Sequence, residues 1–233
     1  MDTILPGVYR LRGLVAGNVY AIEDPDGITL IDTSIPPSGA KILDQVAQLG
    51  HPPTAIKRIL ITHAHPDHVG GLPEIKRHCD AQVWASELEA PVIRGEIPIP
   101  QTPPHRRRGL AKLIVLPETR LPAVPVDRYL SDGELLPEVL GGLRVVGTPG
   151  HAPGHLAFWQ PERRLLFCGD VLFRLPNLRL PYSFLTVDMD ENRRSIAKLA
   201  ELDAAIVCFG HGNPLSDDTA AAIRRFAERV RLD

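Results

Sequence analysis

The stretch Thr62-His-Ala-His-Pro-Asp-His-Val-Gly-Gly71 places four potential metal ligands within six positions, namely His63, His65, Asp67 and His68. It directly follows the apolar run Ile59–Ile61, which is typical of a buried strand, so one strand end delivers all four side chains to one turn. Neutral imidazole suits zinc and iron, and a neighbouring carboxylate suits a second, harder metal position. A metal site is therefore the first hypothesis.

The spacing inside this stretch favours two metal positions rather than one. Alternate side chains of an extended segment point the same way, so His63 and His65 are placed to bind one ion together. Pro66 ends the extended run, and the turn directs Asp67 and His68 toward a neighbouring ion.

Three later apolar runs each end in one further candidate ligand. The runs are Leu143–Gly147, Leu165–Gly169 and Ala204–Phe209, and they lead to His151, Asp170 and His211. Glycines beside these three residues allow sharp turns. A single aspartate or histidine at a strand end is more often a turn or loop residue, so these three gain meaning from the cluster that precedes them.

The order HxHxDH, TPGH, GD and GHG resembles the metallo-β-lactamase superfamily of metallohydrolases, and the resemblance extends from Asn18–Tyr20 and Leu30–Thr33 to His211. It implies an α+β fold, a four-layer αββα sandwich of two similar halves with the metal site at one edge. It also implies a single domain over residues 1–233.

By motif position, the resemblance implies that one metal is bound by His63, His65 and His151, and a second by Asp67, His68 and His211, with Asp170 as the bridge. It further implies that Asp32 and His155 orient ligands through hydrogen bonds without contacting metal. For these last two residues, a turn aspartate and a half-buried strand histidine are equally good interpretations.

The expected activity is hydrolysis of an ester-like bond: a lactone, a thioester or a carboxylic ester. Two divalent ions, Zn²⁺ first with Fe or Mn as other choices, would hold a bridging hydroxide as the nucleophile. Asp67 is the expected catalytic residue, because it would bind metal and orient that hydroxide. The alternative is a persulfide dioxygenase with one Fe(II) bound by His63, His151 and Asp170.

Two better-known branches of the superfamily fit less well. Lactamases with a cysteine in the second metal site have it where this chain has Asp170. Acyl-homoserine lactonases carry a tyrosine three residues after the bridging aspartate, and Phe173 stands there instead.

The amino-acid composition limits the classes of binding partner that we expect. A net charge of −2 and a pI near 6.5 argue against a nucleic-acid surface, and no apolar run is long enough to span a membrane. The start has no signal-peptide pattern. We therefore expect a cytoplasmic enzyme acting on a small molecule, with a homodimer possible.

Two irregular segments should determine specificity. Residues 91–130 are rich in proline and form an expected lid or dimer contact; they include a basic cluster, His105–Arg108 with Lys112, that is more readily a solvated patch than an anion site. Residues 173–184 follow Asp170 and supply the substrate-pocket candidates Phe173, Arg174 and Tyr182.

The remaining pattern predicts strands at 8–11, 19–23 and 28–32 and near 143, 155, 164 and 204, and helices at 38–49, 67–78, 190–202 and 217–230. Ser38 is a candidate cap for the first helix, and Asp188 with Glu191 resembles a capping box for the third.

Overall fold

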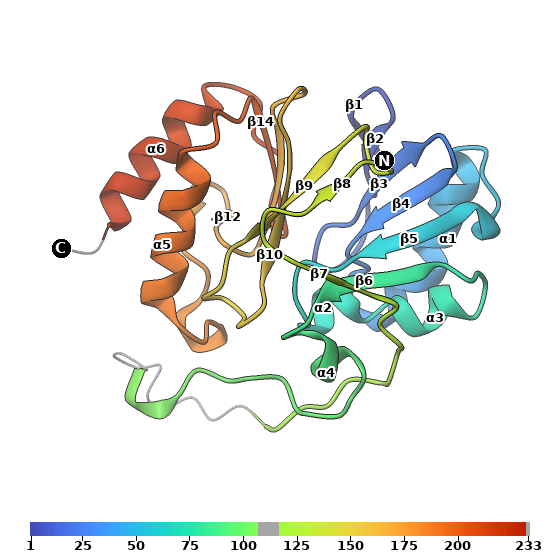
Figure 1. Cartoon of the computed structure of the whole chain (residues 1–233), viewed down its shortest axis with the longest axis horizontal. Coiled ribbons are helices and arrows are strands. Elements are labelled where there is room, and N and C mark those ends of the chain that lie inside the picture. The colour runs from blue at the N-terminus through green and yellow to red at the C-terminus, as the bar shows by residue number, and fades with distance from the viewer. Residues whose placement is uncertain (107–116, 232–233) are drawn as a thin grey trace.

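A computed structural model describes residues 1–106 and 117–231. Two sheets face each other in the middle of the molecule, and helices cover both outer faces (Figure 1). This is the predicted four-layer αββα arrangement.

The first sheet has the strand order β1-β2-β3-β4-β5-β6-β7. These strands are β1 Asp2–Leu5, β2 Val8–Arg10, β3 Tyr20–Asp24, β4 Gly27–Ile31, β5 Ile56–Leu60, β6 Gln82–Ser86 and β7 Arg128–Leu130. From β4 to β7 neighbouring strands run parallel. The carboxyl ends of β4, β5 and β6 therefore open on one edge of the sheet.

The second sheet has the order β14-β11-β10-β9-β8, and a two-stranded sheet, β12-β13, follows β11. The strands are β8 Leu135–Leu136, β9 Leu143–Gly147, β10 Leu156–Gln160, β11 Leu165–Gly169, β12 Phe173–Arg174, β13 Leu178–Arg179 and β14 Ile206–Phe209. Strands β11 and β14 are parallel, so their carboxyl ends lie at the same edge of the second sheet.

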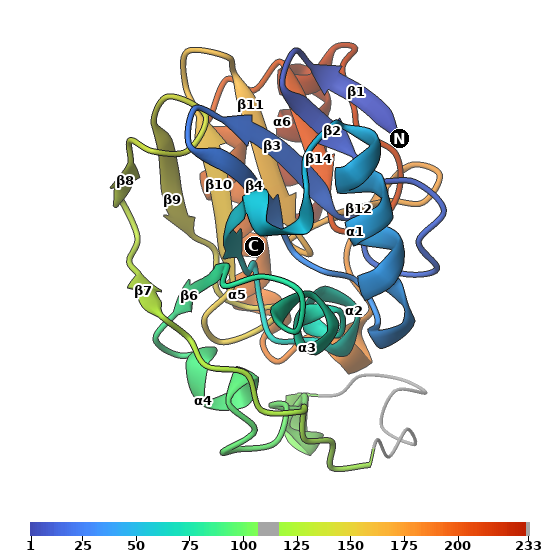
Figure 2. The same cartoon turned by 90° about the vertical axis from the view of Figure 1, so that its right-hand side faces the viewer.

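The helices lie outside the sheets. Helix α1 (Gly39–Gln48) and the short helices α2 (Pro66–Val69), α3 (Leu72–Lys76) and α4 (Ala90–Ile93) belong to the first half, and α5 (Met189–Ala200) and α6 (Thr219–Val230) cover the second sheet (Figure 2). Single 3₁₀ turns occur at Pro36–Ser38, Pro53–Ala55, Pro104–Arg106 and Ser183–Leu185. Within the described ranges, no helix is long and apolar enough to cross a bilayer.

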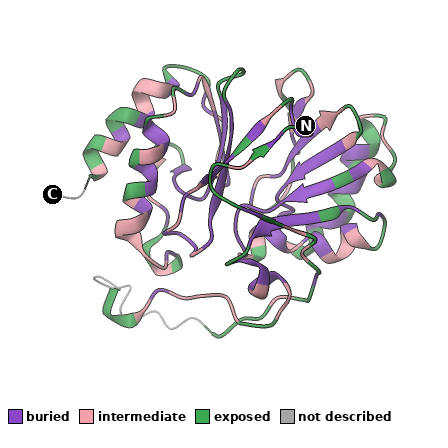
Figure 3. Ribbon diagram, viewed as in Figure 1, coloured by how far each residue is buried: buried purple, intermediate pink, exposed green. Residues whose placement is uncertain are grey.

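Strand alternation gives each sheet two buried faces (Figure 3). Leu60 and Phe158 pack between the sheets, whereas Ile59 packs with Ile42 under α1. Each fully buried side chain of this size contributes about 1.5–3 kcal/mol. The strand ends that carry the candidate ligands are thus fixed by a core on both sides.

The expected helix 67–78 is wrong as one helix. It is divided at Gly70-Gly71, and Gly71 passes so close to Thr33 that a Cβ would lie 2.4 Å from the Thr33 carbonyl oxygen. Pro73 also has no N–H and its ring would clash with the Val69 carbonyl in a continuous helix. The interruption lets His68 and the start of α3 turn independently.

Of the two expected caps, one is absent and the other forms only in part, because the Asp188 N–H donates to the Gly150 carbonyl oxygen and not to Glu191. Asp188 accepts hydrogen bonds from the backbone N–H groups of Asp190 and Glu191 at the start of α5. Ser38 makes no side-chain cap; its hydroxyl donates to Ser34 Oγ instead, at 3.1 Å.

The segment 91–130 is less irregular than expected at its ends, because α4 overlaps its start and β7 closes it. The described part that leads to the 3₁₀ turn Pro104–Arg106 runs along one end of the molecule toward α5 (Figure 1). There the Thr102 hydroxyl lies 3.1 Å from the Ser183 carbonyl oxygen and 2.8 Å from that of Thr186. Most of the predicted basic cluster, namely Arg107, Arg108 and Lys112, lies outside the described residues.

Candidate metal centre

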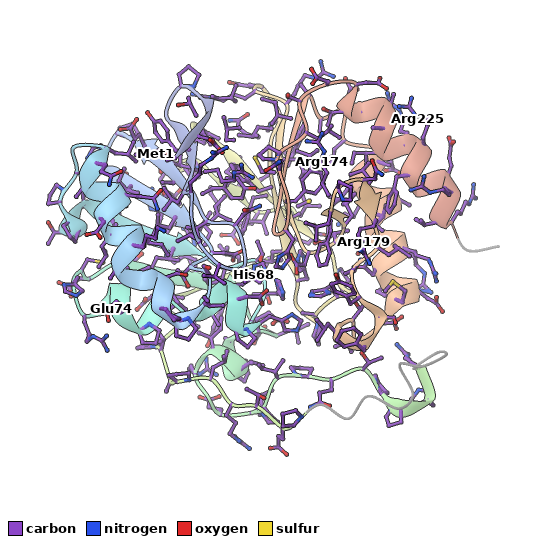
Figure 4. All side chains as sticks on the ribbon, turned by 180° about the vertical axis from the view of Figure 1, so that it is seen from behind. Met1, His68, Glu74, Arg174, Arg179 and Arg225 are labelled. Carbon is purple, nitrogen blue, oxygen red and sulfur yellow. The ribbon has the colours of Figure 1, made fainter. Side chains whose placement is uncertain are left out.

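Four strand ends gather the seven candidate ligands at one edge of the two sheets. Strand β5 leads to the HxHxDH turn, and the ends of β9, β11 and β14 precede His151, Asp170 and His211. Figure 4, seen from behind, shows His68 between the two halves of the molecule. Residues 148 positions apart in sequence therefore share one site.

Three overlapping groups of side chains could each hold a metal ion, because their ligand atoms lie within 4.8 Å of one another. They are His63, His65 and His151; His63, His68 and Asp170; and Asp67, His68 and His211. Four-coordinate zinc at about 2.0–2.1 Å from nitrogen or oxygen needs comparable separations. All seven sequence-predicted ligands are brought together.

Asp170 lies at the centre of this arrangement. Its Oδ2 is 3.5 Å from His151 Nε2 and 3.3 Å from His211 Nε2, and its Oδ1 is 3.4 Å from His68 Nε2. Its side chain is 4% exposed. One buried carboxylate thus contacts histidines of both outer groups.

Asp67 and His211 form the open side of the site. Asp67 Oδ2 lies 3.2 Å from His211 Nε2, and the two side chains are 30% and 21% exposed. Two histidines of the other group, His63 and His151, are almost completely buried, and His65 is intermediate. A small molecule would reach the centre from the side of Asp67.

Hydrogen bonds orient His63 and His68 through Asp32. Asp32 Oδ2 lies 2.7 Å from His68 Nδ1 and accepts the Thr62 hydroxyl proton at 2.8 Å. The carboxylate can only accept, so Nδ1 of His68 carries a proton. The Thr62 oxygen then accepts from His63 Nδ1, 3.0 Å away. Both rings consequently present Nε2 to the site.

The second half of the site is oriented in the same way. Thr186 Oγ1 donates to the Tyr182 carbonyl oxygen at 2.9 Å and lies 3.1 Å from His151 Nδ1, which leaves His151 Nε2 as the ligand atom. His155 Nε2 accepts the backbone N–H of Asp170 at 3.0 Å. Asp32 and His155 therefore contact ligands, and His155 does so through the backbone.

The charge states of four buried histidines suit a cation. Burial lowers the pKa of His65 to about 4 and that of His155 to about 3, and it also lowers the pKa values of His63 and His151. These rings are neutral at physiological pH, which is the form that binds metal. Burial works against a charged His211, but Asp170 and Asp67 raise its pKa to about 9.

Unpaired buried atoms provide a direct test of the fit. His63 Nε2, His68 Nε2 and Asp170 Oδ1 are buried and have no hydrogen-bond partner. Leaving such polar atoms unsatisfied costs about 1–3 kcal/mol each. All three face the same centre, so a bound metal ion would satisfy them. Imidazole and carboxylate donors together fit zinc, iron or manganese.

Gly210 makes room for this convergence. A Cβ at this position would lie 2.0 Å from Asp170 Oδ1 and 2.9 Å from His68 Cε1. Any other residue would displace the carboxylate from the histidines. The glycine in the GHG motif is thus explained by packing against the site.

The three predicted pocket residues have different surroundings. Phe173 is buried, with its ring centroid 4.8 Å from that of His211. Tyr182 is exposed and packs on Phe173. The Arg174 guanidinium donates to the Pro214 carbonyl oxygen. Arg174 therefore fixes the loop after His211.

Glu89 is a structural residue of the site that was not predicted from the sequence. Its Oε2 accepts the N–H of Ala64, between His63 and His65, at 2.8 Å, and its Oε1 accepts the N–H of Gly154 at 2.7 Å. The carboxyl group is buried, which raises its pKa. It joins the HxHxDH turn to the loop after His151. Its Ser86-x-x-Glu89 spacing at a strand end is the signal that could have identified it.

We expect Glu89→Ala to lower the free energy of unfolding by about 2–5 kcal/mol, because two buried amides lose their acceptor. Zinc affinity should fall about 10–100-fold, as for other groups that orient ligands. Denaturant unfolding and chelator competition measure the two effects. Glu87→Ala, at an exposed position in the same turn, is the control; equal zinc affinity in both variants would show that Glu89 does not position the ligands.

The comparisons with known proteins agree with this geometry. Residues 12–211 match the family model described as Metallo-beta-lactamase superfamily. A probable metallo-hydrolase of Bacillus subtilis is 32% identical over 231 residues, covering 90% of this chain and 85% of that protein. A hydroxyacylglutathione hydrolase of Pseudomonas aeruginosa is 33% identical over 195 residues, covering 78% of this chain and 61% of that enzyme.

Solved structures show the same fold. A metallo-beta-lactamase family protein from Thermus thermophilus aligns with a TM-score of 0.71 at 28% identity, covering 98% of this chain and 79% of that chain. A subclass B3 metallo-beta-lactamase of Bradyrhizobium japonicum aligns with a TM-score of 0.70 at 27% identity, covering 98% and 89%.

Proposed function

The chain belongs to the metallo-beta-lactamase superfamily, and from this premise we propose that it is a two-metal hydrolase of ester-like bonds. Relatives named as metallo-hydrolases and hydroxyacylglutathione hydrolases support hydrolysis as the reaction class. The observation that carries the two-metal proposal is the position of Asp170, whose carboxylate contacts His151 on one side and His68 and His211 on the other.

In this proposal His63, His65 and His151 hold one metal, and Asp67, His68 and His211 hold the other, with Asp170 shared. Zinc is the first choice, because imidazole and carboxylate ligands suit it. Two bound divalent ions supply hydroxide at neutral pH by lowering the pKa of water toward about 7, and they polarise the bond under attack.

The residues of the chain supply the remaining functions. Asp67 Oδ2 contacts His211, and this partly exposed carboxylate would accept a hydrogen bond from the attacking water. Asp32 and Thr186 keep the Nδ1 protons on His68 and His151. The Phe173 ring excludes water from one side of the centre through its contact with His211. The preferred substrates are lactones, thioesters and carboxylic esters.

The iron dioxygenase alternative uses a subset of the same residues. His63 Nε2 and His151 Nε2 lie 3.9 Å and 3.5 Å from Asp170 Oδ2, so that triad is also assembled. A complete second group of Asp67, His68 and His211 favours the hydrolase.

Removal of metal provides the general test. Dialysis against a chelator should abolish hydrolysis of a panel of lactones, thioesters and esters, since the proposed nucleophile depends on metal. Adding back about two equivalents of Zn²⁺ should restore it. Activity that survives complete metal removal, or hydrolysis of no member of the panel by the metal-loaded protein, would contradict the proposed function.

A further inference from the structure

A cavity of about 810 Å³ lies beside the metal centre, between residues 178–190, the start of α5 and the end of α6. Its described lining is basic, with arginines from four separate segments and only two aspartates. The arginines are Arg106, Arg179, Arg193, Arg194 and Arg229, and the aspartates are Asp188 and Asp190. The excess of positive charge is local, because the whole chain carries a net charge of −2.

Three of these arginines are already neutralised. Arg106 pairs with Asp188, Arg193 with Asp190, and Arg194 with Glu191. Arg179 and Arg229 make no ion pair with any carboxylate in residues 1–106 and 117–231. Two positive charges in one cavity therefore lack a counter-charge from the described chain.

Both unneutralised guanidinium groups are held on aromatic rings. The Arg179 guanidinium carbon lies 4.8 Å from the ring centroid of Tyr182, and that of Arg229 lies 5.0 Å from the centroid of Phe226. Stacking fixes the plane of a guanidinium group and leaves the N–H donors at its edge for a carboxylate or phosphate. Arg229 Nη2 also donates to the Leu178 carbonyl oxygen at 3.4 Å, which uses one of its five N–H groups. Figure 4 shows Arg179 beside α5.

Direct contacts connect the cavity to the metal centre. Tyr182 lines the cavity, its ring centroid is 6.1 Å from that of Phe173, and Phe173 is 4.8 Å from His211. Thr186 also lines the cavity and lies 3.1 Å from His151 Nδ1. The rings of Tyr182 and Phe173 thus separate the cavity from His211, and the Thr186 side chain separates it from His151.

We propose that this cavity binds an anionic group, a carboxylate or a phosphate, of a substrate whose ester-like bond lies at the metal centre. Arg179 and Arg229 bind the anion, and Tyr182, which lines the cavity, contacts the apolar part that connects it to the reacting carbonyl. That the molecule carrying the anion is a substrate rests on the proposed hydrolase function. The existence of the anion site does not depend on that function.

Matched thioesters test the proposal. The butyryl group is offered on N-acetylcysteamine, which is neutral, on glutathione, which carries carboxylates, and on coenzyme A, which carries phosphates. For the preferred anionic carrier, the ratio of its kcat/KM to that of the neutral thioester should fall about tenfold or more in Arg179→Gln/Arg229→Gln. A ratio of this kind is insensitive to a partial loss of folded protein.

The control is Arg77→Gln/Arg225→Gln, which removes the same total charge from residues outside the cavity that pair with Glu74 and Asp218. This control should leave the ratio unchanged. An unchanged ratio in Arg179→Gln/Arg229→Gln, or an equal fall in both double variants, would overturn the proposal. The carrier that loses more identifies a carboxylate or a phosphate as the anion.

Calorimetric binding of glutarate and inorganic phosphate to the metal-loaded proteins separates the two proposals. Any binding of the anion to the metals is the same in all variants, so a difference between variants reports on the cavity alone. At least one of the two anions should bind about tenfold more weakly to Arg179→Gln/Arg229→Gln than to the control. If that difference is found but no ester or thioester is hydrolysed, the anion site stands and the hydrolase proposal fails. If neither anion distinguishes the variants, the anion site is refuted even in an active hydrolase.

Discussion

Asp67→Ala is expected to reduce kcat for the best ester or thioester substrate by about 10³-fold or more, a loss in the range found when a group that positions a transferred proton is removed. The structure gives the reason. Asp67 is the carboxylate on the open side of the site, 30% exposed and 3.2 Å from His211. It is therefore placed both to complete the second metal group and to orient a water molecule.

The fold should survive this substitution. The Asp67 side chain is partly exposed and lies at the start of a four-residue helix, so its removal creates no large cavity. Steady-state kinetics, with circular dichroism to monitor folding, measure the effect. Asp44→Ala removes an exposed carboxylate from α1 and should leave kcat unchanged. Near-native turnover in Asp67→Ala would exclude the proposed role.

Asp170→Asn should have the second large effect, the loss of metal from both positions. The carboxylate is buried and contacts three histidines within 3.5 Å. An amide of the same shape has one acceptor oxygen and no charge, so it cannot bridge two cations. Metal content should fall from about two ions per chain to fewer than one, and hydrolysis should fall to background.

His211→Ala provides a useful contrast with this variant. It removes one ligand from the open side only, so the group formed by His63, His65 and His151 should keep its ion. Asp203→Asn, at an exposed ion pair with Arg164, should retain the full metal content. Elemental analysis of the purified proteins measures all three. Two ions per chain in Asp170→Asn would show that Asp170 is not the shared ligand.

The seven candidate ligands could be expected to lie near one another because each one follows an apolar strand within a few residues. The core fixes strand ends, and parallel strands such as β4 and β5 or β11 and β14 open on one edge. Spacing along the chain therefore carried information about distance in space. The convergence of Asp170 on His68 and His151 follows from that rule.

What the sequence could not predict depends on contacts between irregular segments. The helix expected at 67–78 was wrong because Gly71 packs against Thr33, which no local pattern indicates. Glu89 resembles a helix-start residue, yet its carboxylate turns inward to Ala64 and Gly154.

The basic cavity was hidden for the same reason. Arg179 lies in a short strand after a loop and Arg229 in the last turn of α6, 50 positions later. Neither belongs to a motif, and only the packing of α6 against residues 178–190 brings them to one cavity. The arginine of this region that was predicted to line the substrate pocket is Arg174, but its guanidinium binds a backbone carbonyl.

The role of residues 91–130 as a lid or dimer contact stays a prediction. The described part reaches the wall of the cavity, since Thr102 lies within hydrogen-bond distance of the Ser183 and Thr186 carbonyl oxygens and Arg106 pairs with Asp188. Thr186 in turn contacts His151. The segment is thus attached to residues next to the metal centre.

The most direct measurement is the metal content per chain of protein purified anaerobically without added metal. The proposed hydrolase predicts about two zinc or similar divalent ions, one for the group of His63, His65 and His151 and one for the group of Asp67, His68 and His211, with Asp170 between them. A single iron ion per chain would contradict the two-metal centre and would leave Asp67, His68 and His211 as an unused second group.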